Sequence, residues 1–210
     1  MKMTQRLTGF ALMAGASLLG LALAGGARAA DVNTLVENCA NCHGKDGASH
    51  NSDIPTIGGF SATYIDGSLT AYKDKARPCP EAKYINGPKK GQTTDMCKVA
   101  NELSAADIKQ VAQYFAGKKF VRAKQKFDAA LAAEGKKYHA DHCEKCHTEG
   151  GTVADDDSGI LAGQWMSYVA EAFKEFDSGK RPMDKKMKPK YEKLDKAKKE
   201  ALLNYYASFQ

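Results

Sequence analysis

The pentapeptide Cys-x-x-Cys-His occurs twice in this 210-residue chain, and it constrains the fold more than any other feature. The copies occupy residues 39–43 (CANCH) and 143–147 (CEKCH). Thiols three residues apart lie on one side of a helix, so both can bond to the vinyl groups of one porphyrin, and the adjacent His can ligate its iron. The sequence therefore predicts two covalent c-type haems. The predicted attachment residues are Cys39, Cys42, Cys143 and Cys146, and the predicted axial nitrogen ligands are His43 and His147.

Structural zinc and a dithiol redox centre are the alternative interpretations of a Cys-x-x-Cys pair. A zinc site would require both Cys pairs to converge on one ion. Neither alternative explains why His follows the second Cys in both copies. The repeated pentapeptide therefore favours haem.

An internal repeat points to a second ligand for each iron. An offset of 104 residues relates the two motifs and carries Tyr64 to Tyr168, whereas further along an offset of 91 carries Met96 to Met187. The first half therefore holds about thirteen extra residues between Tyr64 and Met96. Because both halves place a methionine at the same point of the repeat, Met96 and Met187 are predicted to be the thioether axial ligands.

Two alternatives to these methionines stay open. Met183 lies four residues before Met187 and competes with it in the second half. A distal His is the other alternative, but the available histidines have no counterpart in the opposite half, and we expect them on solvated surfaces. They are His50, His139 and His142.

The remaining pattern is helical, without a convincing run of strand-like alternation. Apolar residues at helical spacing indicate helices over 104–116 and 194–209, and a short helix is expected over 31–38. The predicted fold is all-α, with two tandem class I cytochrome c domains over 30–119 and 120–210. Residues 127–134 are expected to extend the first helix of the second domain.

The N-terminus has the features of a secretory leader. Lys2 and Arg6 precede an apolar stretch, and small residues at 27 and 29 flank a cleavage site, which predicts a signal peptide over 1–29 and a periplasmic location. Its removal leaves 28 basic against 25 acidic residues, a balance that argues against nucleic acid as a partner. No later segment is apolar enough to span a membrane.

Two cysteines, Cys79 and Cys97, lie outside both motifs, in the stretch that contains the extra residues. An oxidising compartment favours a disulfide between them, which would also hold the segment carrying Met96 close to its haem. The alternatives are that their thiols bind another metal or contact a sulfur substrate.

The two-fold repeat resembles the dihaem class I cytochromes c, and residues 120–210 resemble the cytochrome subunit of flavocytochrome c sulfide dehydrogenase. The similar stretches are 123–128 (AKQKFD), 143–147 (CEKCH), 160–165 (ILAGQW), 181–187 (RPMDKKM) and 206–208 (YAS). The resemblance implies a partner flavoprotein that oxidises sulfide at FAD and passes single electrons to this chain. It also implies a small electron acceptor, such as another cytochrome c, and no substrate chemistry in this chain alone.

The chain has no Gly-x-Gly-x-x-Gly dinucleotide-binding fingerprint after a predicted strand, so FAD would belong to the partner. Two other functions remain open: a free-standing dihaem shuttle to a terminal oxidase, and a thiosulfate-oxidising cytochrome. An exposed apolar patch on the first domain, where a flavoprotein would dock, would favour the cytochrome subunit of a flavocytochrome. Lysines around a haem edge without such a patch would favour the shuttle.

Overall fold

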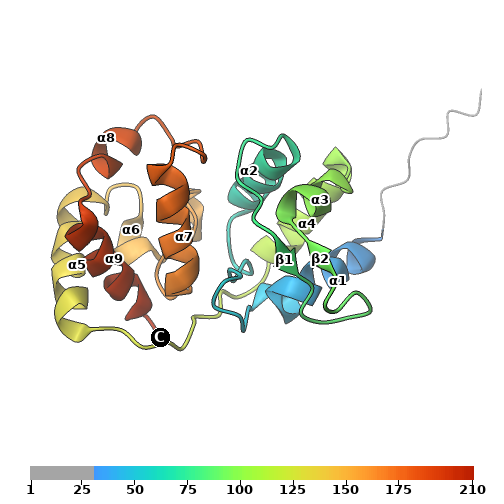
Figure 1. Cartoon of the computed structure of the whole chain (residues 1–210), viewed down its shortest axis with the longest axis horizontal. Coiled ribbons are helices and arrows are strands. Elements are labelled where there is room, and N and C mark those ends of the chain that lie inside the picture. The colour runs from blue at the N-terminus through green and yellow to red at the C-terminus, as the bar shows by residue number, and fades with distance from the viewer. Residues whose placement is uncertain (1–30) are drawn as a thin grey trace, which may run out of the picture.

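The computed structural model describes residues 31–210, and the predicted leader lies outside them. The described chain is mostly helical, which confirms the predicted fold class, and Figure 1 shows its helices in two groups joined by an extended segment. The first group contains α1 (Val32–His43), η1 (Lys45–Gly47), α2 (Ala62–Lys73), α3 (Met96–Asn101) and α4 (Ala105–Ala116). The second contains α5 (Ala129–His142), α6 (Thr148–Gly151), η2 (Ala154–Asp156), α7 (Met166–Asp177), α8 (Lys188–Tyr191) and α9 (Lys196–Ala207). Among residues 31–210, no helix has the length and apolar character needed to cross a membrane.

Side-chain caps set where several helices begin. At the start of α4, the Ser104 hydroxyl accepts from the Asp107 backbone N–H at 3.1 Å, and the Asp107 carboxylate accepts from the Ser104 N–H at 2.9 Å. At the start of α5, the Asp128 carboxylate accepts from the backbone N–H groups of the second and third helical residues. Because this cap begins the helix at Ala129, the expectation that the helix includes Phe127 is wrong.

The first half contains a small sheet that the sequence pattern missed. Strands β1 (Ala82–Lys83) and β2 (Thr93–Thr94) pair antiparallel, with Ala82 opposite Thr94. Each strand is only two residues long, too short to show an alternating pattern. The hairpin lies within the stretch where the first half carries its extra residues.

Each group of helices has its own hydrophobic core. In the first, α4 packs against both α1 and α2, and the buried residues include Val36, Leu69 and Phe115. Ile160 from the second half joins this core. In the second, α9 contributes Leu202, Tyr205 and Tyr206. The close approach of α5 to α9 requires Gly135, because a Cβ there would collide with the Ala201 carbonyl oxygen.

Buried hydrogen bonds join the two halves. The Gln164 side chain, 1% exposed, accepts from the Thr56 backbone N–H at 3.0 Å and donates to the Thr56 carbonyl at 2.8 Å. The Trp165 indole N–H donates to the Ser49 carbonyl at 3.2 Å. These bonds set the position of one half against the other.

Candidate haem sites

The first site is a cavity whose wall carries all four residues predicted for it. Cys39, Cys42 and His43 come from the last two turns of α1, and Met96 comes from the first residue of α3. Apolar side chains, Leu103 among them, form much of the remaining wall. A cavity with two thiols, an imidazole and a thioether on largely apolar walls fits a covalently attached haem.

His43 is held in the form that binds iron. Its Nδ1 lies 2.8 Å from the Pro55 carbonyl oxygen, which only accepts, so Nδ1 carries the proton and Nε2 keeps its lone pair. Burial lowers the pKa of His43, which keeps the ring neutral. The motif therefore supplies the ligand, and Pro55, twelve residues further along, orients it.

The thiols of the first motif are poor candidates for dithiol redox chemistry. Burial raises the pKa of Cys39 to about 12 and also raises the pKa of Cys42. Disulfide exchange uses the thiolate, which these environments disfavour.

A disulfide lies beside Met96. Cys79 and Cys97 are bonded, with their Cα atoms 5.7 Å apart. Cys97 follows Met96 directly, and the preceding Asp95 caps α3 by accepting from the Lys98 N–H at 2.8 Å. The Asp95 carboxylate lies close enough to both sulfurs for the three groups to share a metal ion. Both sulfurs are bonded in the disulfide, however, so neither is a thiolate that could bind a metal.

The hairpin of the extra segment covers the first site. The backbone N–H groups of Ile85 and Asn86 donate to the Asn41 carbonyl, inside the first motif, at 3.1 and 3.0 Å. The buried residues Tyr84 and Thr94 line the cavity. The extra residues therefore form part of the wall of the first cavity, and the second half has no counterpart of this segment.

The second motif differs in its backbone. Whereas α1 includes its motif, α5 ends at His142, so Cys143, Cys146 and His147 follow the helix instead of lying within it. The Nδ1 of His147 is buried without a hydrogen-bond partner. Burial, reinforced by the nearby His139, lowers the pKa of His147 to about 4. A neutral imidazole with an unpartnered nitrogen fits an iron ligand.

The segment carrying the second predicted methionine approaches this motif. Burial raises the pKa of Cys143 to about 11, and the charge of Lys190, three residues after Met187, opposes that rise. Met183 and Met187 are both half-buried. The choice of Met187 over Met183 therefore stays a prediction.

The expectation that His139 is solvated is wrong. It is 1% exposed, and its Nδ1 pairs with the Tyr206 hydroxyl at 3.0 Å. Its Nε2 lies 2.9 Å from the His147 carbonyl and 3.0 Å from the Glu144 carboxylate. His139 thus supports the backbone of the second motif, whereas His50 and His142 are exposed as expected.

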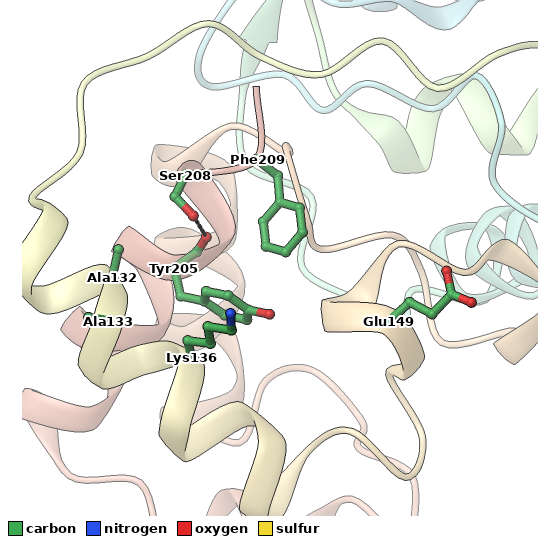
Figure 2. A pocket seen from close by; sticks show the side chains of 7 residues that line it. All are labelled: Ala132, Ala133, Lys136, Glu149, Tyr205, Ser208 and Phe209. Atoms are coloured by element: carbon green, nitrogen blue, oxygen red, sulfur yellow. Dashed lines mark hydrogen bonds between the residues drawn. The ribbon is translucent and has the colours of Figure 1, made fainter.

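A separate pocket in the second half, about 510 Å³ in volume, is shown in Figure 2. Its wall comes from α5, α6 and the end of α9, where the Ser208 hydroxyl donates to the Tyr205 carbonyl at 2.6 Å. The lining residues are Ala132, Ala133, Lys136, Glu149, Tyr205, Ser208 and Phe209, none of them a predicted ligand.

Sequence reasoning missed two arginines that the structure buries at the interface between the halves. Arg77 lines the first cavity, and Arg181 lies beside it across the interface. The offset of 104 relates Arg77 to Arg181, as it relates Tyr64 to Tyr168. Extending the repeat by one more matched position would have found them.

Comparisons with known proteins agree with this architecture. The family model described as cytochrome c matches residues 29–117. Cytochrome c4 of Stutzerimonas stutzeri is 31% identical over 157 residues, which cover 70% of each chain. The crystal structure of reduced recombinant cytochrome c4 from Pseudomonas stutzeri has a TM-score of 0.67 at 27% identity, covering 87% of this chain and all of that one.

A thiosulfate dehydrogenase (TsdBA) from Marichromatium purpuratum shares the fold, with a TM-score of 0.63 at 24% identity over 81% of this chain and 36% of that one. None of the relatives named here is a flavocytochrome subunit, so that finer assignment stays a prediction. Two attachment motifs, two groups of helices and the match to cytochrome c4 over most of its length agree with one another. The chain belongs to the class I cytochrome c family, as a dihaem electron-transfer protein of the cytochrome c4 type.

Proposed function

We propose that this cytochrome is a diffusible periplasmic carrier that takes up and releases single electrons at two haems with His and Met ligands. The observation that carries the proposal is the cavity that gathers Cys39, Cys42, His43 and Met96. When bound, haem iron supplies one-electron chemistry by alternating between its ferrous and ferric states. The cysteines would anchor the ring, Pro55 holds the His43 ring in position, and the apolar walls exclude water.

Exposed lysines support a diffusible carrier. On the hairpin that packs on Asn41 they are Lys83, Lys89 and Lys90, and around Met187 they are Lys185, Lys186, Lys188 and Lys190. Positive side chains beside the predicted haem edges would attract an acidic redox partner. Large exposed hydrophobic side chains in the described residues are Val121 and Phe127, and both lie in the segment between the two groups of helices. That distribution favours transient contacts over a permanent docking face on the first half.

The electron-accepting subunit of a flavocytochrome c sulfide dehydrogenase is the second candidate, supported by the resemblance of residues 120–210. In that case FAD and sulfide chemistry would belong to a partner chain. Thiosulfate chemistry through Cys79 is less well supported, because Cys79 is disulfide-bonded.

Purification from the native periplasm at low salt tests the proposal. We expect a single chain with two haems, no flavin, and electron exchange with acidic redox proteins that slows as salt rises. Co-purification of a larger flavin-containing chain, with haem reduction by sulfide, would instead establish the second candidate. A purified protein with fewer than two haems per chain would contradict both candidate functions.

A further inference from the structure

The first half contains a polar contact that the second half leaves incomplete. In the first half, the Tyr114 hydroxyl donates to the Asp46 carboxylate at 3.1 Å, and the Lys118 ammonium lies 3.1 Å from the same oxygen. Lys118 also lies over the Tyr114 ring, 4.0 Å from its centre. A carboxylate therefore pairs there with a tyrosine hydroxyl and with an ammonium group.

The internal repeat places different residues around Tyr205, the equivalent tyrosine of the second half. The offset of 104 puts Gly150 where the first half has its aspartate, and the offset of 91 puts Phe209 where it has its lysine. Tyr205 is only 8% exposed, and its hydroxyl has no hydrogen-bond partner among residues 31–210. The second half therefore keeps the buried donor and lacks the carboxylate that would accept from it.

The Tyr205 hydroxyl opens into the pocket of about 510 Å³ described above. Figure 2 shows this hydroxyl and the Lys136 ammonium both pointing toward the pocket. Lys136 forms no ion pair within the part of the chain that the structure describes. Ala132 and Phe209 supply apolar wall. A pocket of this volume, with a few polar groups on an apolar lining, is typical of small-molecule sites.

Two acidic residues lie near the pocket, and neither pairs with the tyrosine. Glu149 lines the pocket, but Figure 2 shows its carboxylate turned away from Tyr205. The Glu144 carboxylate accepts from the backbone N–H groups of Glu149 and Gly150 at 2.7 and 3.2 Å, and it lies 3.0 Å from the His139 Nε2. Burial and the charge of Glu144 raise the pKa of Tyr205, so its hydroxyl keeps the proton and remains a donor.

We infer that this pocket binds a small organic carboxylate, whose charged group lies between the Tyr205 hydroxyl and the Lys136 ammonium and whose carbon chain packs on Phe209. The ligand would supply the group that the Asp46 side chain supplies in the first half. Hydrogen bonds to an ionised carboxylate are stronger than those between neutral groups, and burial of the carbon chain adds to the affinity. None of these residues is a predicted haem ligand, so the site is additional to the proposed electron carriage.

Calorimetric titration of the haem-loaded protein with sodium hexanoate, at constant ionic strength, tests the inference. We expect one molecule to bind per chain, with a Kd on the order of 1 mM for a ligand of this size. Hexan-1-ol has the same chain without the charge and should bind about tenfold more weakly.

Variants locate the binding site. Tyr205→Phe and Lys136→Met should each weaken hexanoate binding by about tenfold, because each removes one partner of the charged group. Lys137→Met is the matched control, since Lys137 is exposed on the same helix and does not line the pocket. It should leave the affinity unchanged.

Equal affinities for hexanoate and hexan-1-ol would overturn the inference, because the pocket would then be selective only for apolar chains. Equal losses in Lys136→Met and Lys137→Met would overturn it as well, since they would indicate general charge attraction. Titration without saturable binding would refute the site. If Tyr205→Phe does not accumulate, the lysine variants and the alcohol decide. Electron exchange by the haems is not measured in these titrations, so either result leaves the proposed function unchanged.

Discussion

Each predicted iron ligand depends on side chains or backbone groups outside its motif. His43 belongs to the first pentapeptide, yet the Pro55 carbonyl determines which ring nitrogen is free. His147 belongs to the second, and its carbonyl is held by the buried His139, which the sequence pattern assigned to the surface. The same pentapeptide therefore occurs in two different settings. Burial is common to both and keeps each imidazole neutral.

Substitution of the two competing methionines should identify the ligand of the second haem. Met187→Leu removes the proposed thioether while nearly preserving its volume, and Met ligation raises a haem potential. We expect the potential of one haem to fall by on the order of 100 mV, measured by redox titration. Met183→Leu is the matched control and should leave both potentials in place. The opposite result would make Met183 the ligand.

Among the helices, the contact between α5 and α9 depends on a single glycine. At Gly135 a side chain would meet the Ala201 backbone and the Tyr205 Cβ, neither of which can move without separating the helices. At Gly67, an exposed position in α2, a Cβ would meet nothing within 4 Å. These two glycines share a helical setting and differ in the space around them.

Alanine at these two glycines should have opposite effects on the free energy of unfolding. Gly135→Ala is expected to destabilise the protein by about 2–3 kcal/mol because of overpacking. Gly67→Ala is expected to stabilise it by about 0.5–1 kcal/mol, since alanine favours the helix and restricts the unfolded chain. Guanidinium unfolding of both variants measures the difference. A neutral Gly135→Ala would mean that α5 and α9 separate at little cost.

The disulfide should stabilise the segment that carries Met96. Its cysteines are 18 residues apart, and a cross-link over that length contributes about 3 kcal/mol. We expect the double variant Cys79→Ser with Cys97→Ser to lose stability of this order in denaturant unfolding. A thiol reductant should weaken the unmodified protein similarly and leave the variant unchanged. An equal effect of reductant on both proteins would show that it acts elsewhere.

At the interface between the halves, the buried Gln164 side chain pairs with the Thr56 backbone much as a neighbouring strand would in a sheet. Its amide satisfies both the N–H and the carbonyl of Thr56, so the interface has little tolerance for its loss. A hydrogen bond from Arg77 to Tyr168 lies at the same interface. The position of one half against the other is therefore set by polar groups as well as by Ile160, which packs in the hydrophobic core of the first half.

Gln164→Ala should loosen this interface. The substitution leaves two backbone groups of Thr56 without partners, and we expect a loss of about 2–4 kcal/mol. We also expect unfolding to separate into two transitions, followed by haem absorbance and by helical circular dichroism. Gln113→Ala, at an exposed position on α4, serves as the control and should change stability by less than about 0.5 kcal/mol. A single unshifted transition in Gln164→Ala would contradict this role.

The sequence by itself determined the helical class, the haem motifs and the two-fold repeat, because these depend on spacing between residues near in the chain or at one constant offset. Only the tertiary structure decided how Gln164 meets Thr56, 108 positions away, and how Arg77 meets Tyr168, 91 positions away. It also decided that His139 is buried and that the extra residues form a hairpin over the first motif. The physical reason is that burial and pairing between distant segments arise from the packing of the two halves against each other, and no local pattern encodes that packing.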